Sequence, residues 1–218
     1  MDDLARRIDA ALPQTQCQRC SYADCAAYAQ AIVAGQASIR QCPPGGQEGI
    51  ARLAAITGLP EGPLDTDFGI EGPVTVAIID EDWCIGCTLC IKACPTDAIV
   101  GIHKRMHTVV EPHCTGCELC IPVCPVDCIS LEPVSGGSTG WQAWTPQQAQ
   151  AAKDRYEARK ARLAREKAAQ DTKQTVQLEA KLADLPAHSA ITDPAELERK
   201  RAVVEAALAR ARARRQGG

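Results

Sequence analysis

Two cysteine runs constrain the fold of this 218-residue chain more than any other feature. Residues 84–94 read C-x2-C-x2-C-x3-C and are followed by Pro95, and residues 114–124 repeat this spacing and are followed by Pro125. The similarity extends over residues 82–99 and 112–129, at a constant offset of 30 positions. A small unit repeated in this way buries one face against its twin, so we expect the two copies to form one domain.

The spacing within each run is typical of bacterial ferredoxins, in which cysteines hold [4Fe-4S] clusters and the fourth cysteine of a run ligates the other cluster. Three cysteines separated by two residues can surround one face of a cubane, and the proline redirects the fourth toward the neighbouring site. Zinc is the alternative, but zinc sites usually pair two C-x2-C units that lie further apart. The sequence therefore predicts one cluster on Cys84, Cys87, Cys90 and Cys124, and another on Cys114, Cys117, Cys120 and Cys94.

Three further positions in the repeat each have two interpretations. Gly86 and Gly116 are equivalent in the two copies, and they either allow the backbone to approach cluster sulfurs closely or serve as ordinary turn glycines. Cys128 corresponds to Ala98 in the first copy. A position that accepts alanine in one copy is a small packing site, so we interpret Cys128 as a buried thiol and not as a ligand.

The N-terminal part of the chain has a second cysteine pattern. Four cysteines are spaced C-x2-C-x4-C-x16-C, and a proline again follows the last. Cys25 lies near the predicted start of a helix, where the helix dipole favours a thiolate. By spacing alone, zinc and a [4Fe-4S] cluster are both compatible with this set, which consists of Cys17, Cys20, Cys25 and Cys42.

Composition favours metal ligation over disulfides. The chain has thirteen cysteines but only seven aromatic residues, so large apolar side chains supply little of its core. The start, MDDLARRIDAALPQ, lacks the apolar stretch of an export signal, and no apolar run approaches the roughly 18 residues that suggest a membrane span. These features predict a soluble, cytoplasmic protein with reduced thiols.

Charge divides the chain into an acidic body and a basic tail. Residues 1–144 contain 8 Lys and Arg against 17 Asp and Glu, whereas residues 145–218 contain 16 against 10. Acidic residues alternate with the basic ones in the tail, and Tyr156 is its one aromatic residue. This pattern favours a solvated or partner-binding helical arm over a nucleic-acid-binding segment. A second basic stretch lies at the predicted hairpin turn and contains His103, Lys104, Arg105 and His107. It could dock an acidic partner, but we expect it to be a solvated turn.

Periodicity and turn residues predict an α+β fold. Helices are expected near residues 2–12, 24–34 and 47–57, with left-handed glycine caps at Gly35 and Gly58. Short strands are expected at 74–79, 98–102, 108–111 and 128–132, and helices at 145–185 and 193–215. The predicted domains are a helical module (1–58), a linker (59–73), a ferredoxin-like domain (74–134), a flexible spacer (135–144) and a helical tail (145–218).

Residues 15–46, TQCQRCSYADCAAYAQAIVAGQASIRQCPPGG, followed by the tandem runs, resemble the B-type ferredoxin subunit of the Rnf/Rsx electron transport complex over about residues 1–133. The resemblance implies a third [4Fe-4S] cluster, on Cys17, Cys20, Cys25 and Cys42. It also implies electron transfer by a carrier subunit that is not a stand-alone catalyst. Its partners would be redox proteins that include integral membrane subunits, which would place it peripherally on the cytoplasmic face of the inner membrane. Members of that family usually begin with a membrane-spanning helix, which is not evident here, and the basic tail is not part of their pattern.

Two other functions are compatible with the same residues. The chain could be a soluble polyferredoxin for another redox enzyme, or a cluster-containing sensor that binds nucleic acid through its basic tail. No phosphate-binding loop or acid–base pair is evident, so we expect no small organic cofactor and no hydrolytic active site.

Overall fold

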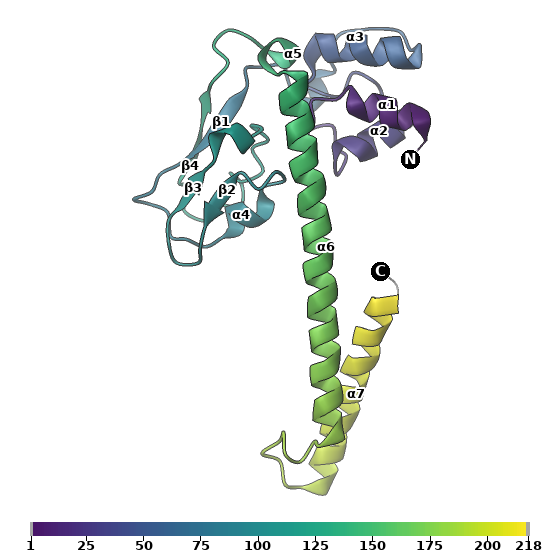
Figure 1. Cartoon of the computed structure of the whole chain (residues 1–218), viewed down its shortest axis with the longest axis vertical. Helices are drawn as coiled ribbons and strands as arrows, with labels where there is room; N and C mark the ends of the chain where they lie inside the picture. Colours follow the sequence, from purple (N-terminus) through teal and green to yellow (C-terminus); the bar gives the residue numbers. More distant parts are fainter. Residues whose placement is uncertain (1, 217–218) are drawn as a thin grey trace. The chain divides into compact units, whose positions relative to one another are not determined.

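The computed structural model describes residues 2–216 and has the predicted α+β class (Figure 1). The chain divides into two compact units, the first ending at Arg159 and the second beginning at Lys160. All thirteen cysteines lie in the first unit, which also contains the short strands.

Three short helices form the N-terminal part of the first unit: α1 (Asp3–Ala10), α2 (Cys25–Val33) and α3 (Gly46–Thr57). The Asp24 carboxylate caps α2 by accepting a hydrogen bond of 2.7 Å from the Ala27 N–H, as an N-cap residue should. Gly58 ends α3 in the left-handed conformation, with φ at 74°, and Gly35 has φ at 69°. The three predicted helices and both glycine caps are confirmed. Their apolar faces meet in a core formed by Ile8, Leu12, Tyr28, Ile32, Ile39, Ile50 and Leu53.

The cysteine repeat folds as two antiparallel strand pairs with one short helix, α4 (Leu89–Ala93). Strand β1 (Thr75–Ile79) pairs with β4 (Ile129–Pro133), so that Ile79 lies opposite Ile129. Strand β2 (Ile99–Gly101) pairs with β3 (His107–Val109). The four predicted strands are confirmed to within two residues at each end. Two single-turn helices, η1 (Thr66–Phe68) and η2 (Glu111–His113), lie in the connecting segments.

Residues 135–144, which were expected to form a flexible spacer, pack against the body of the first unit. They contain the single-turn helix α5 (Gly140–Ala143), and the Ser135 hydroxyl accepts a hydrogen bond of 2.9 Å from the Val74 N–H. The side chains of Trp141 and Trp144 are buried, and Trp144 Nε1 donates to the Pro13 carbonyl at 2.8 Å. Burial of two indole rings outweighs the flexibility of the Ser/Gly sequence. The boundary between compact units consequently lies beyond this segment, within the next helix.

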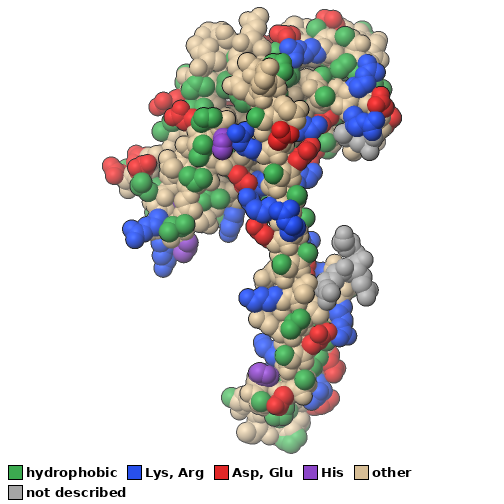
Figure 2. Space-filling model, in the orientation of Figure 1, with side chains coloured by type: hydrophobic (Ala, Val, Ile, Leu, Met, Phe, Trp, Pro, Cys, Tyr) green, Lys and Arg blue, Asp and Glu red, His purple; other side chains and the backbone are tan. Residues whose placement is uncertain are grey.

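Two long helices follow, α6 (Pro146–Ala183) and α7 (Pro194–Gln216). Both begin near the predicted residues, and the Thr145 hydroxyl accepts a hydrogen bond of 3.2 Å from the Gln148 N–H at the start of α6. Within the second unit, Arg212 of α7 forms an ion pair of 2.7 Å with Glu179 of α6. Basic and acidic side chains alternate over these two helices in Figure 2. Within the described part of the chain, no helix has both the length and the apolar character that crossing a membrane requires.

Candidate metal centres

Three cavities in the first unit are each surrounded by cysteine thiols. We call them the N-terminal cavity, the first-run cavity and the second-run cavity, and the space between atoms at each, open solvent included, is about 290, 270 and 330 Å³, respectively. They are therefore similar in size. Their cysteines are Cys17, Cys20, Cys25 and Cys42 for the N-terminal cavity, Cys84, Cys87, Cys90, Cys124 and Cys128 for the first-run cavity, and Cys94, Cys114, Cys117 and Cys120 for the second-run cavity.

The fourth cysteine of each run lies at the cavity of the other run. Cys94 follows the last residue of α4, where the backbone changes to an extended conformation with ψ at 118°, and Pro95 fixes the direction of the chain beyond it. Its thiol thereby reaches the second-run cavity, while Cys124 reaches the first-run cavity. The structure thus places the four cysteines of each of these two predicted groups around one cavity, and Cys128 is a fifth cysteine at the first-run cavity.

Backbone N–H groups point at several of these sulfurs. Ala77 N–H donates to Cys114 Sγ at 3.4 Å, and the residue 30 positions later, His107, donates its N–H to Cys84 Sγ at 3.4 Å. In addition, Ala98 N–H donates to Cys94 Sγ at 3.2 Å. Hydrogen bonds of this kind stabilise a thiolate over a thiol, and the repeated pair shows that the two halves of the domain share one pseudo-twofold design.

Gly86 and Gly116 have positive φ values of 68° and 63°, and both approach protein backbone closely. A Cβ on Gly86 would lie 2.4 Å from the backbone of Arg105, and one on Gly116 would lie 2.6 Å from the Thr75 carbonyl oxygen. These neighbours are also 30 residues apart. Both glycines are therefore required by the packing of a cysteine loop on a strand or hairpin, a reason that neither interpretation of the sequence included.

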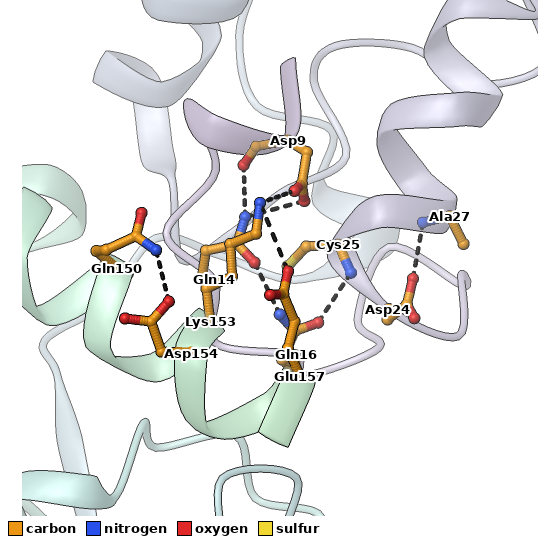
Figure 3. A network of polar contacts seen from close by, with 10 residues as sticks. All are labelled: Asp9, Gln14, Gln16, Asp24, Cys25, Ala27, Gln150, Lys153, Asp154 and Glu157. Atoms are coloured by element: carbon orange, nitrogen blue, oxygen red, sulfur yellow. Dashed lines mark hydrogen bonds and ion pairs between the residues drawn. The ribbon is translucent and has the colours of Figure 1, made fainter. Parts of the chain in front are cut away.

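A buried hydrogen-bond network connects the N-terminal cavity to α6 (Figure 3). The Cys25 N–H donates to Gln16 Oε1 at 3.0 Å, and Gln16 Nε2 donates to Gln14 Oε1 at 2.8 Å. Gln14 Nε2 then donates to Asp9 Oδ1 at 3.0 Å, and the Lys153 ammonium pairs with Asp9 Oδ2 at 2.5 Å. Sequence reasoning missed this network, because Cys25 and Lys153 are far apart in the chain and Lys153 lies in no motif.

Burial keeps several of the free thiols protonated. It raises the pKa of Cys117 and of Cys120 to about 12, and it raises the pKa of Cys25 and of Cys42 well above the ordinary thiol value. The expectation of a thiolate at Cys25 is therefore wrong for the free thiol, since loss of hydration outweighs the helix dipole. A bound metal centre would replace these protons.

His107 and Cys128 contribute to the first-run cavity, and sequence reasoning assigned neither to it. Although His103, Lys104 and Arg105 are exposed, as expected for a solvated turn, His107 is 1% exposed, and its Nδ1 lies 3.3 Å from Cys90 Sγ. Cys128 is buried, as predicted, but it also lines the cavity, with its Sγ 3.5 Å from Cys124 Sγ. Comparison with Ala77, the counterpart of His107 in the repeat, could have drawn attention to the histidine.

The donor sets fit iron–sulfur clusters. Among residues 2–216, no group of three or more His, Cys, Asp or Glu side chains is arranged to hold one metal ion. The cysteines instead surround a cavity, and main-chain N–H groups face their sulfurs. A [4Fe-4S] cluster brings its own iron and sulfide and is held by four surrounding thiolates, so the residues present match its requirements.

Comparison with known families supports this assignment. A family model described as a 4Fe-4S dicluster domain matches residues 77–131, and another described as a putative Fe-S cluster matches residues 12–44. The fold and these matches define an iron–sulfur protein that contains a ferredoxin-like dicluster domain.

Similar proteins identify the family within this class. The B-type subunit of the ion-translocating oxidoreductase complex of Azoarcus sp. (strain BH72) is 60% identical over 141 residues, which cover 65% of this chain and 77% of the relative. The corresponding proteins of Thiobacillus denitrificans and Alkalilimnicola ehrlichii are 55% and 54% identical, with 64% and 66% of this chain and 74% and 78% of each relative covered. The chain belongs to this family, the B-type subunits of the Rnf/Rsx complex.

Proposed function

We propose that this chain transfers electrons as the B-type iron–sulfur subunit of an Rnf/Rsx-type ion-translocating oxidoreductase complex. The observation that carries the proposal is the set of three cavities within one compact unit, each lined by at least four cysteines. When bound, a [4Fe-4S] cluster takes up and releases one electron, while the protein sets its potential and surroundings. The proposed ligands are Cys17, Cys20, Cys25 and Cys42 for one cluster, Cys84, Cys87, Cys90 and Cys124 for a second, and Cys114, Cys117, Cys120 and Cys94 for a third.

This assignment gives the parts of the chain different roles. The N-terminal module and the ferredoxin-like domain bind the clusters, and the helical tail is an arm that contacts partner proteins. We assign the chain to the cytoplasmic face of the membrane, where integral membrane subunits of the complex would hold it. The relatives support the presence of partner subunits, because their name describes one subunit of a larger complex.

Contacts within the first unit favour a particular order of the three centres. The Thr115 hydroxyl donates to the Thr15 carbonyl at 2.9 Å, and Arg19 forms an ion pair with Glu118. Thr15 lines the N-terminal cavity, and Thr115 lines the second-run cavity. Because this hydrogen bond joins the walls of the two cavities, the order that we propose is N-terminal, second-run, first-run.

Magnetic coupling between the reduced centres tests this order. Neighbouring paramagnetic clusters broaden each other's EPR signals, and the effect falls steeply with distance. Cys87→Ala, which should remove the first-run centre, is expected to preserve the coupling of the N-terminal signal. Cys117→Ala, which should remove the middle centre, is expected to abolish that coupling in protein that retains about eight irons. Loss of coupling in Cys87→Ala, with coupling preserved in Cys117→Ala, would contradict the proposed order.

Affinity purification tests the assignment to a membrane complex. Tagged full-length chain is captured anaerobically from detergent-solubilised membranes and, in parallel, from the soluble fraction. We expect integral membrane redox subunits to be recovered from the first and absent from a purification with the tag alone. Recovery of soluble redox enzymes only would favour the polyferredoxin alternative, and nucleic acid that dissociates as salt is raised would favour the sensor.

A further inference from the structure

The two cavities of the dicluster domain differ at several equivalent positions, and at two of them the first-run cavity alone has a side chain that can donate a hydrogen bond to a ligand sulfur. His107 lines the first-run cavity, while its counterpart Ala77 lines the second-run cavity. Cys128 lines the first-run cavity, while its counterpart Ala98 lines the second-run cavity. At both positions the second-run cavity has only a methyl group. The second-run cavity does have two hydroxyls, of Thr96 and Thr115, where the first-run cavity has Val126 and Ile85, but these hydroxyls donate to the His113 and Thr15 carbonyls and not to a cysteine sulfur.

The His107 imidazole is oriented as a hydrogen-bond donor to a cysteine sulfur. Its Nδ1 lies 3.3 Å from Cys90 Sγ, and a cysteine that ligates iron is deprotonated and can only accept. Its Nε2 is buried and has no hydrogen-bond partner among the described residues. A ring with a proton on Nδ1 and none on Nε2 satisfies both facts, because a proton on Nε2 would leave a buried N–H unpaired.

The strand opposite His107 has a residue that makes space for this ring. Gly101 lies directly across the β2–β3 pair from His107, and a Cβ on Gly101 would lie 2.3 Å from His107 Cδ2. In the other half, Ala77 lies across the β1–β4 pair from Leu131. In the β2–β3 pair the large residue is His107 on β3 and the small one is Gly101 on β2, whereas in the β1–β4 pair the small residue is on β1 and the large one on β4. The packing of the first half is therefore arranged to hold the histidine ring.

Cys128 supplies a second donor to the same cavity. Its Sγ lies 3.5 Å from Cys124 Sγ. If Cys124 is an iron ligand, as proposed above, its thiolate can only accept, so the proton of this contact belongs to Cys128. Ala98, the counterpart, offers the equivalent ligand Cys94 only its backbone N–H, at 3.2 Å.

We propose that His107 and Cys128 are positioning residues that raise the reduction potential of the first-run centre above that of the second-run centre. Hydrogen bonds to cluster sulfurs stabilise the more negative, reduced state, and more so in a buried site of low dielectric. With the proposed order of centres, electrons that enter through the N-terminal module would collect at the far end of the domain. This inference rests on the proposed function.

Redox titration followed by EPR, on full-length protein with its clusters, tests the inference. His107→Leu removes the donor at similar volume, and Cys128→Ala copies the other half of the repeat. Each is expected to lower the potential of the first-run centre and leave the second-run centre unchanged. His107→Asn and Cys128→Ser, which retain a donor, are the matched controls and should stay close to the unsubstituted protein. The reciprocal change Ala98→Cys should raise the potential of the second-run centre.

The outcomes separate this inference from the proposed function. Unchanged potentials in His107→Leu and Cys128→Ala, with full iron content, would overturn the inference alone, as would equal shifts of both centres. Loss of a cluster in Cys128→Ala would also overturn it, since Cys128 would then be a ligand. If His107→Leu fails to retain iron, the potentials of Cys128→Ala and Ala98→Cys test the inference in its place. Absence of clusters from the unsubstituted protein would contradict the proposed function itself.

Discussion

Replacing Cys94 and Cys114 together with alanine is expected to remove about four irons per chain, no more than either replacement alone. The two cysteines belong to different runs, but they line the same cavity and are proposed to hold the same cluster. Anaerobically purified wild-type protein should contain about 12 irons, and both the single and the double variant about eight. The measurement is iron and sulfide per chain, with zinc determined in the same samples.

A second double variant is the matched control for this prediction. Cys84 and Cys94 belong to one run but line different cavities, so replacing both should reduce the iron content to about four. If each run instead held its own cluster, the two double variants would exchange their results. Cys128→Ala should keep about 12 irons, because Cys128 is not a proposed ligand. Cys20→Ala should lose about four irons from the N-terminal module, and stoichiometric zinc with about eight irons in the wild type would contradict the third cluster.

The grouping of the cysteines could be predicted from the sequence because it follows from local spacing and one repeat. C-x2-C-x2-C places three thiols around one point, and the offset of 30 positions identifies the equivalent cysteines of the two runs. The helices and strands were predictable for a similar reason, since Asp24, Gly35 and Gly58 act on the backbone next to them.

The environment of the cysteines could not be predicted, because it depends on contacts between distant segments. The Lys153–Asp9 pair joins residues 144 positions apart, and no local pattern distinguishes Lys153 from the other lysines of α6. The burial of Trp144 depends on a hydrogen bond to the Pro13 carbonyl, while the surrounding Ser and Gly residues favour a flexible segment. His107 was misassigned because it is adjacent to an exposed basic turn, whereas strand β3 directs its ring into the domain.

Gly116→Ala is expected to destabilise the dicluster domain strongly, whereas Gly35→Ala should have a small effect. The two glycines have nearly the same backbone conformation, with φ at 63° and 69°, so alanine costs about 1 kcal/mol at either position for the left-handed backbone. They differ in the space available. A Cβ on Gly35 would meet no atom within 4 Å, but one on Gly116 would lie 2.6 Å from the Thr75 carbonyl oxygen and 2.8 Å from its hydroxyl.

The difference in stability between Gly116→Ala and Gly35→Ala measures how tightly the cysteine loop packs on β1. Relieving the contact at Gly116 would move the loop that carries Cys114 and Cys117 away from Ala77, whose N–H donates to Cys114 Sγ. The added cost is on the order of 3 kcal/mol, so the temperature at which cluster absorbance is lost should fall by much more in Gly116→Ala than in Gly35→Ala. Equal decreases would mean that the close approach to Thr75 does not limit this loop. Gly86→Ala should behave like Gly116→Ala, because its Cβ would lie 2.4 Å from the Arg105 backbone.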